Sequence, residues 1–96
     1  MKNYYLYIIT NYNKTTLYTG VTNDLERRLQ EHKQETSDSF SKHYKLKYLV
    51  YYEESPDVDE IIEREKQIKK WNRQWKEELI NSMNPKWEDL SKGWEL

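Results

Sequence analysis

The 96-residue chain contains no cysteine and only two glycines and two prolines. The absence of cysteine excludes disulfide bonds, thiolate zinc sites and cysteine nucleophiles. No apolar run approaches the roughly 18 residues of a membrane-spanning helix, and the first residues lack the basic-then-apolar pattern of a signal peptide. We therefore expect a soluble, cytoplasmic protein that does not enter the membrane.

Aromatic and charged residues, in contrast, are abundant. Nine tyrosines and four tryptophans provide large rings to bury, which predicts a folded chain despite 34% charged residues and a mean hydropathy of -1.22. The length predicts one domain covering residues 1–96. The net charge is -1, yet residues 61–76 hold six basic residues against two acidic ones. Such a cluster is typical either of a solvated helix face or of a phosphate-binding patch.

Segments rich in aromatic and β-branched residues predict three strands, over residues 4–10, 15–20 and 45–53. The two asparagines of residues 11–14 predict a turn, so the first two strands form an antiparallel hairpin. The polar residues 36–39 predict a loop before the third strand.

Two helices are predicted from capping residues and apolar spacing. The first follows Thr22 or Asn23, either of which can cap it. The second begins at residues 55–57, where a proline lies near its first turn, and runs to about Met83. A break near Asn72 is the alternative to one continuous helix.

The tail, residues 87–96, has apolar residues at spacings that allow one further short amphipathic turn. The element order is therefore β-β-α-β-α-(α). This order predicts an α+β fold, in which helices flank a small three-stranded antiparallel sheet.

The second helix carries an acidic residue where an apolar one is expected. Its apolar stripe runs through Ile61, Ile68, Trp75 and Leu79, and the same stripe passes through Glu65 and Asn72. A carboxylate on the core side of a helix is costly unless it is paired, protonated or bound to a cation. Glu65 is thus a candidate metal ligand or base. The alternatives are a partner for a neighbouring arginine and a position at the rim of a wide stripe.

Polar residues also fall together on the first helix and on the hairpin. Arg28 and His32 lie four residues apart and share one helix face. Arginine has a planar fork suited to phosphate oxygens, and histidine can carry a proton near neutral pH. Tyr7 and Tyr18 lie on the two hairpin strands, where their hydroxyls can converge, and Gly20 predicts special backbone geometry or a close approach. An ordinary boundary pair and strand-forming tyrosines are the structural alternatives.

Together these residues resemble the GIY-YIG endonuclease family, in particular its small single-domain bacterial members. The two name motifs correspond to Tyr5-Leu6-Tyr7 and Tyr18-Thr19-Gly20, followed eight residues after the glycine by Arg28 and four residues later by His32. Residues 61–65 resemble the helix that supplies the family's metal-binding glutamate, and residues 84–90 resemble the end of the small members. The first motif lacks its leading glycine and isoleucine, and a threonine replaces the central isoleucine of the second.

The resemblance implies an endonuclease that hydrolyses DNA phosphodiester bonds with one Mg²⁺ or Mn²⁺ ion. It implies a catalytic role for Tyr7, Tyr18, Arg28, His32 and Glu65, with Glu65 as the metal ligand. The two phenols, the guanidinium and the acid are then expected to gather around one ion, and either tyrosine can be the base. For the family's terminal asparagine, Asn72 and Asn84 are the candidates, and neither is assigned.

DNA is the expected partner, held through its backbone by basic side chains that carry no sequence information. These side chains are Lys42, Lys45, Lys69, Lys70, Arg73 and Lys76. We expect low sequence specificity and action on branched, nicked or single-stranded DNA in repair or recombination. One alternative is a nucleic-acid-binding module of the same fold with weak or no catalysis. Another is a partner-binding module that uses the tryptophans of the second helix and tail, which otherwise complete the core.

Overall fold

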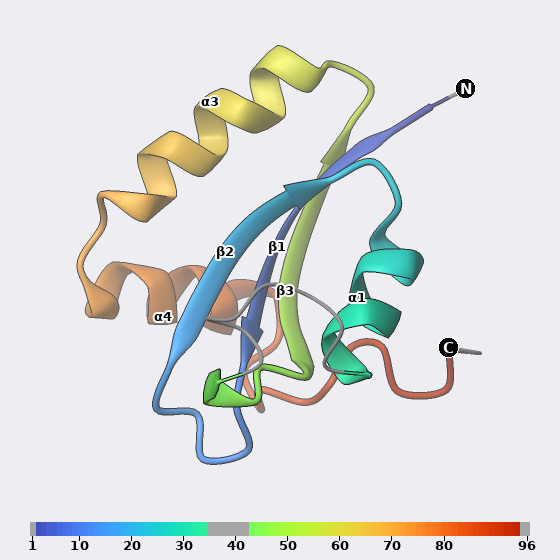
Figure 1. Ribbon diagram of the computed structural model, residues 1–96. Coiled ribbons are helices and arrows are strands. Elements are labelled where there is room, and N and C mark those ends of the chain that lie inside the picture. Colours follow the sequence, from blue (N-terminus) through green and yellow to red (C-terminus); the bar gives the residue numbers. More distant parts are fainter. Residues whose placement is uncertain (1, 35–42, 95–96) are drawn as a thin grey trace.

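The computed structural model describes residues 2–34 and 43–94, so Lys42 and the predicted loop at 36–39 lie outside the described residues. The elements are β1 (Tyr4–Thr10), β2 (Leu17–Thr22), α1 (Leu25–Lys33), β3 (Tyr48–Ser55), α3 (Val58–Lys69) and α4 (Arg73–Met83). The three strands form one antiparallel sheet in the order β2-β1-β3 (Figure 1). The predicted α+β class is confirmed.

The strands β2 and β3 begin and end later than the sequence predicted. The Asn11 side-chain oxygen accepts hydrogen bonds from the backbone N–H groups of Thr15 and Thr16, which keeps both residues in the hairpin loop. Lys45 has a φ of 55°, in the left-handed region, and a strand does not contain this conformation. Local hydrogen bonding and backbone geometry thus outweigh β propensity at both strand starts.

The cap of α1 also differs from the prediction. Asp24, rather than Thr22 or Asn23, is the N-cap, and its side chain accepts a hydrogen bond from the N–H of Arg27. The Thr22 hydroxyl instead accepts the N–H of Asp24 and so fixes the turn that leads into the helix.

The predicted second helix is divided into two helices, α3 and α4. This agrees with the alternative prediction of a break near Asn72. The Asn72 side chain accepts the N–H of Trp75 and caps α4. The single apolar stripe predicted over residues 61–79 was therefore wrong at Trp75, whereas Leu79 packs against buried core residues. Ile61 and Ile68 are buried, whereas Trp75 is 52% exposed, because the break changes the direction of the chain between them.

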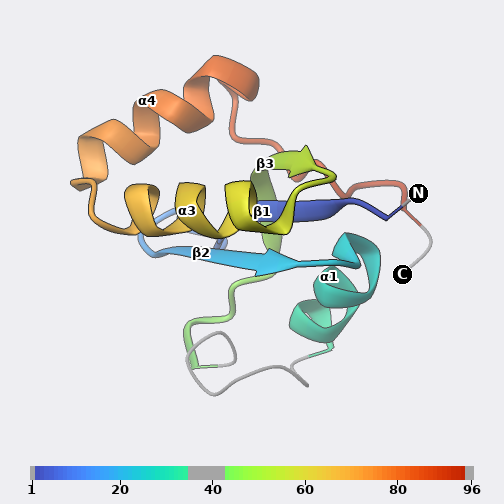
Figure 2. The same ribbon diagram turned by 90° about the horizontal axis from the view of Figure 1, so that it is seen from above.

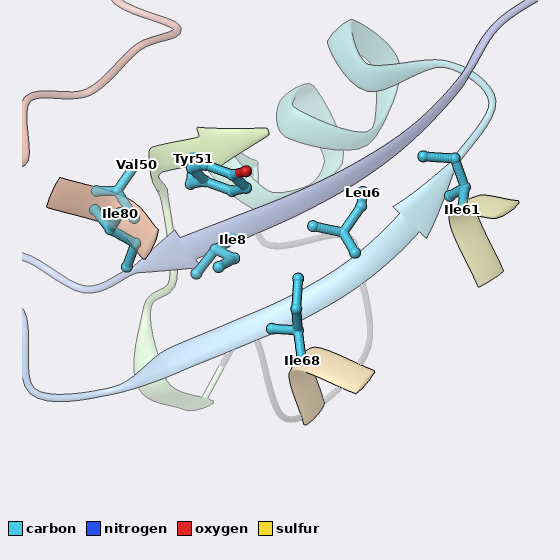
Figure 3. Close-up of a cluster of buried hydrophobic side chains, with 7 residues drawn as sticks. All are labelled: Leu6, Ile8, Val50, Tyr51, Ile61, Ile68 and Ile80. Carbon is cyan, nitrogen blue, oxygen red and sulfur yellow. The ribbon is translucent and has the colours of Figure 1, made fainter. Parts of the chain in front are cut away.

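Helices cover both faces of the sheet, with α1 on one side and α3 and α4 on the other (Figures 1 and 2). The core on the α3 side consists of Leu6, Ile8, Val50, Tyr51, Ile61, Ile68 and Ile80 (Figure 3). The core on the α1 side consists of Tyr7, Ile9, Leu25, Leu29, Leu46 and Leu49. Alternate residues of a strand face opposite sides, so β1 contributes to both cores. Among the described residues, no helix is long and apolar enough to cross a bilayer.

The C-terminal tail binds the sheet through side-chain hydrogen bonds. Its described part, residues 86–94, contains turns and no helix, so the further helix that the predicted element order allowed does not form there. The Asn84 side chain donates to the carbonyl oxygens of Val50 and Glu88. Asp89 accepts the N–H of Leu49. Polar contacts to β3, rather than a helical repeat, therefore fix the tail.

Three of the four tryptophans complete the core, as the sequence suggested. Trp71 and Trp87 pack against the core on the α3 side, and Trp94 packs against the core on the α1 side. Trp75 does not follow this expectation, because it lines an exposed hollow of about 440 Å³ beside Trp71 and Leu79. An apolar patch of the kind that the partner-binding alternative predicts is thus present on α4.

We expect Asp89→Ala to destabilise the fold by about 1–3 kcal/mol at pH 7, because Leu49, Ser91 and Lys33 would lose a charged acceptor. Partial burial raises the pKa of Asp89, but hydrogen bonds from Ser91, Lys33 and Leu49 outweigh it and lower the pKa overall. A carboxylate whose pKa is lower in the folded state than in the unfolded state stabilises the fold at pH values above its unfolded pKa of about 3.9. This contribution is lost as the pH falls through the folded pKa.

Urea denaturation at pH 7 and at about pH 3 measures this effect. The destabilisation should shrink at the lower pH, while the exposed control Glu63→Ala should show little change at either pH. An equal destabilisation by Asp89→Ala at both values would show that the charge of Asp89 contributes nothing.

Candidate active site

Four of the five predicted catalytic residues meet on the α1 side of the sheet. The Tyr7 hydroxyl accepts a hydrogen bond from Arg28 Nε at 3.0 Å and lies 3.1 Å from His32 Nε2. The Tyr18 ring centroid lies 6.3 Å from that of Tyr7 and 6.0 Å from that of His32. We call Tyr7, Tyr18, Arg28 and His32 the tyrosine–arginine cluster.

Strand register and helix periodicity explain why these residues meet. Tyr7 pairs directly with Gly20 in the sheet, and Tyr18 lies two residues before Gly20, so both tyrosines face the same side. On α1, Leu29 is buried against the sheet, and Arg28 and His32, four residues apart, share the helix face beside it.

Gly20 is necessary for steric rather than conformational reasons. A Cβ atom at this position would lie 2.6 Å from the Tyr7 hydroxyl oxygen and 3.0 Å from the Tyr18 ring. The backbone of β2 therefore provides the space that the Tyr7 hydroxyl occupies, and the close approach predicted from the sequence is confirmed.

The cluster combines a buried layer with a more accessible one. Tyr7 and His32 are each 1% exposed, whereas Tyr18 and Arg28 are half-buried. Because the Tyr7 oxygen accepts from Arg28, its own hydrogen can be donated to His32 Nε2. Because Nε2 is then the acceptor, the N–H hydrogen of the His32 ring lies on Nδ1.

The Arg28 guanidinium remains charged in this setting. Partial burial lowers the pKa of Arg28, but its hydrogen bond and charge interaction with Tyr7, together with Glu31, outweigh burial and raise the pKa overall. The ion pair with Glu31 measures 3.2 Å. Glu31 was not among the predicted site residues, although its position three residues after Arg28 indicates such a pair.

Glu65 lies on α3, on the opposite side of the sheet from α1. Its carboxylate forms an ion pair with Lys69 at 3.3 Å. Successive helical residues are about 100° apart, so Arg64 and Glu65 flank the buried Ile61 and Ile68 on opposite sides. Arg64 contacts Glu53 on β3, so Glu65 lies on the flank of α3 nearer to the edge strand β2.

The other predicted residues have mixed environments. Lys45 and Lys70 are exposed, and Lys76 is half-buried. Arg73 donates to the backbone carbonyls of Lys14 and Thr15, and so has a structural contact within the chain. Both asparagines offered as the family's terminal residue also have structural contacts here, Asn72 as a helix cap and Asn84 as the link to the tail.

The sequence matches the family model of the GIY-YIG catalytic domain over residues 3–78. It is 38% identical over 86 residues to a UPF0213 protein of Syntrophus aciditrophicus, and the aligned part covers 88% of this chain and 97% of that protein. It is 35% identical over 88 residues to a UPF0213 protein of Clostridium perfringens, covering 92% and 94%. The solution NMR structure of a UPF0213 protein from Bacillus halodurans matches with a TM-score of 0.60 at 26% identity, covering 98% of this chain and 99% of that one.

The family match spans β1, β2, α1, β3 and α3, which carry both tyrosines, Arg28, His32 and Glu65. The geometry of the cluster and the sequence comparison therefore agree. This chain belongs to the GIY-YIG family of nucleases.

Proposed function

We propose that this protein is a divalent-metal-dependent endonuclease that hydrolyses DNA phosphodiester bonds with low sequence specificity. The observation that supports this most directly is the contact of Arg28 and His32 with the Tyr7 hydroxyl, at the positions of the family motifs. Phosphodiester cleavage requires a proton acceptor for the attacking water and stabilisation of the charge that grows on the phosphoryl oxygens.

Arg28 would stabilise the growing phosphoryl charge. Tyr7 and Glu31 hold its guanidinium from two sides, at 3.0 Å and 3.2 Å. A cation that is oriented before the substrate binds needs little reorganisation during the reaction. Arg28 therefore acts as an oriented clamp on the scissile phosphate in this proposal.

Tyr18 would take the proton from the attacking water. Tyr7 is 1% exposed, and its hydroxyl already contacts Arg28 and His32, so Tyr7 and His32 position Arg28 in this scheme. Tyr18 is half-buried, and its ring lies beside those of Tyr7 and His32, at centroid distances of 6.3 Å and 6.0 Å. The more accessible phenol is the one that a substrate water can reach.

Glu65 fits a single divalent ion by the chemistry of its donor atoms. Mg²⁺ binds through one or two carboxylates and keeps several waters, and no group of three or more metal-ligating side chains occurs among the described residues. Lys69, the partner of Glu65, is 52% exposed, and such a surface pair is weak enough to give way. When bound, the ion would neutralise phosphate charge and favour ionisation of water.

Cleavage assays on plasmid, branched and single-stranded DNA, with Mg²⁺, Mn²⁺ or a chelator, test the proposed function. We expect cleavage with either metal and none with the chelator. Binding without cleavage on every substrate would instead support the alternative, a nucleic-acid-binding module of the same fold.

Glu65→Gln should raise the Mg²⁺ concentration for half-maximal cleavage by about ten-fold or more, because an amide is a weaker ligand for a hard cation. The exposed neighbour Glu63→Gln is the matched control and should leave the Mg²⁺ dependence unchanged. An unchanged Mg²⁺ dependence in Glu65→Gln would remove Glu65 from metal binding.

In the same reactions, Tyr18→Phe should remove the rise in cleavage rate with pH that a phenol base produces. Tyr7→Phe should lower the rate and keep the rise. The opposite pattern would assign the base to Tyr7.

A further inference from the structure

The hairpin loop between β1 and β2 presents a tyrosine to solvent. Tyr12 is 81% exposed, and its ring centroid lies 6.4 Å from that of Tyr48 on β3. Together with Trp87 of the tail, the two tyrosines line a hollow of about 450 Å³. We call the hollow bounded by Tyr12, Tyr48 and Trp87 the hairpin pocket.

The loop holds Tyr12 in place without burying it. The Asn11 side chain accepts the N–H groups of Thr15 and Thr16 and donates to the Thr15 hydroxyl. From α4, Arg73 donates to the carbonyl oxygens of Lys14 and Thr15 at 2.6 Å and 2.9 Å. An aromatic ring on a braced loop loses little conformational entropy when a flat ligand binds it.

Basic side chains surround the aromatic walls. Lys33 Nζ lies 5.9 Å from the centroid of the Tyr48 ring, and the Arg73 guanidinium lies 5.9 Å from that of Trp87. Lys14 lines the pocket, and Lys86 lines the adjoining hollow beside Trp87. Lys33 and Arg73 are ion-paired with Asp89 and Glu77. The positive charge that the rim offers to a ligand therefore comes mainly from Lys14 and Lys86.

Aromatic walls with a cationic rim fit a ligand that is flat and aromatic in one part and anionic in another. A nucleotide of a single strand has both parts, and proteins bind such strands by stacking bases on aromatic rings while basic groups follow the backbone. Bases in an intact duplex are already stacked within the helix and do not enter such a pocket.

The hairpin pocket adjoins the tyrosine–arginine cluster. His32 belongs to the cluster, and the next residue, Lys33, lies over the Tyr48 wall. Tyr18 pairs with Ile9, three residues before Tyr12, which corresponds to about 10 Å along an extended chain. One strand can thus contact both places.

We infer that the hairpin pocket receives an unpaired base of the nucleic-acid strand that is cleaved at the tyrosine–arginine cluster. This inference rests on the proposed function and adds a subsite to it. Tyr12 is the principal stacking residue, and Lys14 and Lys86 contact the adjoining phosphates. The subsite favours substrates with an unpaired nucleotide next to the scissile bond.

Fluorescence anisotropy with the full chain, in chelator to prevent cleavage, tests the subsite. The probes are a labelled oligothymidylate and a blunt duplex of equal length. Tyr12→Ala should weaken binding of the single strand by about ten-fold, which corresponds to about 1.4 kcal/mol and lies within the range for one stacked base. Tyr12→Phe should restore binding, because it keeps the ring, and duplex binding should not change.

Trp75→Ala is the matched control, because Trp75 is an exposed aromatic residue outside the pocket. The subsite would be overturned if Tyr12→Ala left the affinity for the single strand unchanged, or if it weakened duplex binding as much as single-strand binding. It would also be overturned if Trp75→Ala weakened single-strand binding as much as Tyr12→Ala. Thymidine monophosphate is a further probe. If the protein bound it as tightly as the single strand, the pocket would be assigned to free nucleotides instead.

Cleavage separates this inference from the proposed function. If the wild-type protein cleaves DNA while Tyr12→Ala binds single strands normally, the subsite is wrong and the nuclease stands. If Tyr12→Ala weakens single-strand binding while no substrate is cleaved under any metal condition, the subsite stands and the nuclease is wrong.

Discussion

Arg28→Ala is expected to lower the rate of DNA cleavage by about a hundred-fold to a thousand-fold, the range found when one oriented donor is removed from a charged transition state. Two contacts support so large an effect. Arg28 Nε donates to the Tyr7 hydroxyl, and Arg28 Nη1 pairs with Glu31. The guanidinium is therefore part of a fixed constellation, and water cannot replace it at the same position.

Arg28→Lys should recover only part of the rate, because an ammonium group keeps the charge and loses the planar fork. The exposed neighbour Arg27→Ala is the matched control, and it should show nearly normal cleavage. Initial rates at saturating DNA and Mg²⁺ measure the effect, and circular dichroism confirms the fold. Rates within a few-fold of wild type in a folded Arg28→Ala protein would refute the role of Arg28.

Gly20→Ala is expected to damage the fold and the cluster together. The new Cβ would lie 2.6 Å from the Tyr7 hydroxyl oxygen and 2.7 Å from the adjoining ring carbon, and Tyr7 is 1% exposed. Overpacking of a tight core costs about 1–3 kcal/mol. Tyr7 must shift away from Arg28 and His32, and a displacement of about 1 Å can lower the rate by about a hundred-fold.

Thermal unfolding and cleavage rates measure the two consequences. Gly93→Ala is the control, because a Cβ there meets nothing within 4 Å, although Gly93 has a φ of +92°. That variant should lose about 1 kcal/mol of stability from backbone strain and keep normal cleavage. Normal cleavage in Gly20→Ala would show that the contact with Tyr7 is not needed.

The elements with strong local signals were predictable from the sequence. The run of β-branched and aromatic residues in β1 gave the observed bounds Tyr4–Thr10. The break between α3 and α4 was predicted only as the alternative to one continuous helix, and the structure shows Asn72 as the cap at that break. The starts of β2 and β3 were not predictable in this way. They depend on side-chain hydrogen bonds of Asn11 and on the left-handed backbone of Lys45, which propensity does not report.

The candidate site was predictable to a similar degree. Helical spacing placed Arg28 beside His32, and the resemblance to the family motifs connected them to Tyr7 and Tyr18. The sequence could not divide the tyrosines into a buried one and an accessible one. That distinction arises because Gly20 lies opposite Tyr7 in the register, and α1 packs over the same side of the sheet.

By itself, the sequence determined the order of the elements, the α+β class and the residue types available for chemistry, because periodicity and caps are local properties of the chain. Only the tertiary structure decided that Tyr7, Arg28 and His32 touch, that Glu65 lies across the edge strand from them, and that Tyr12 joins Tyr48 and Trp87 in one pocket. These contacts join residues far apart in the chain. Strand register and helix packing bring such residues together, and both depend on the whole fold.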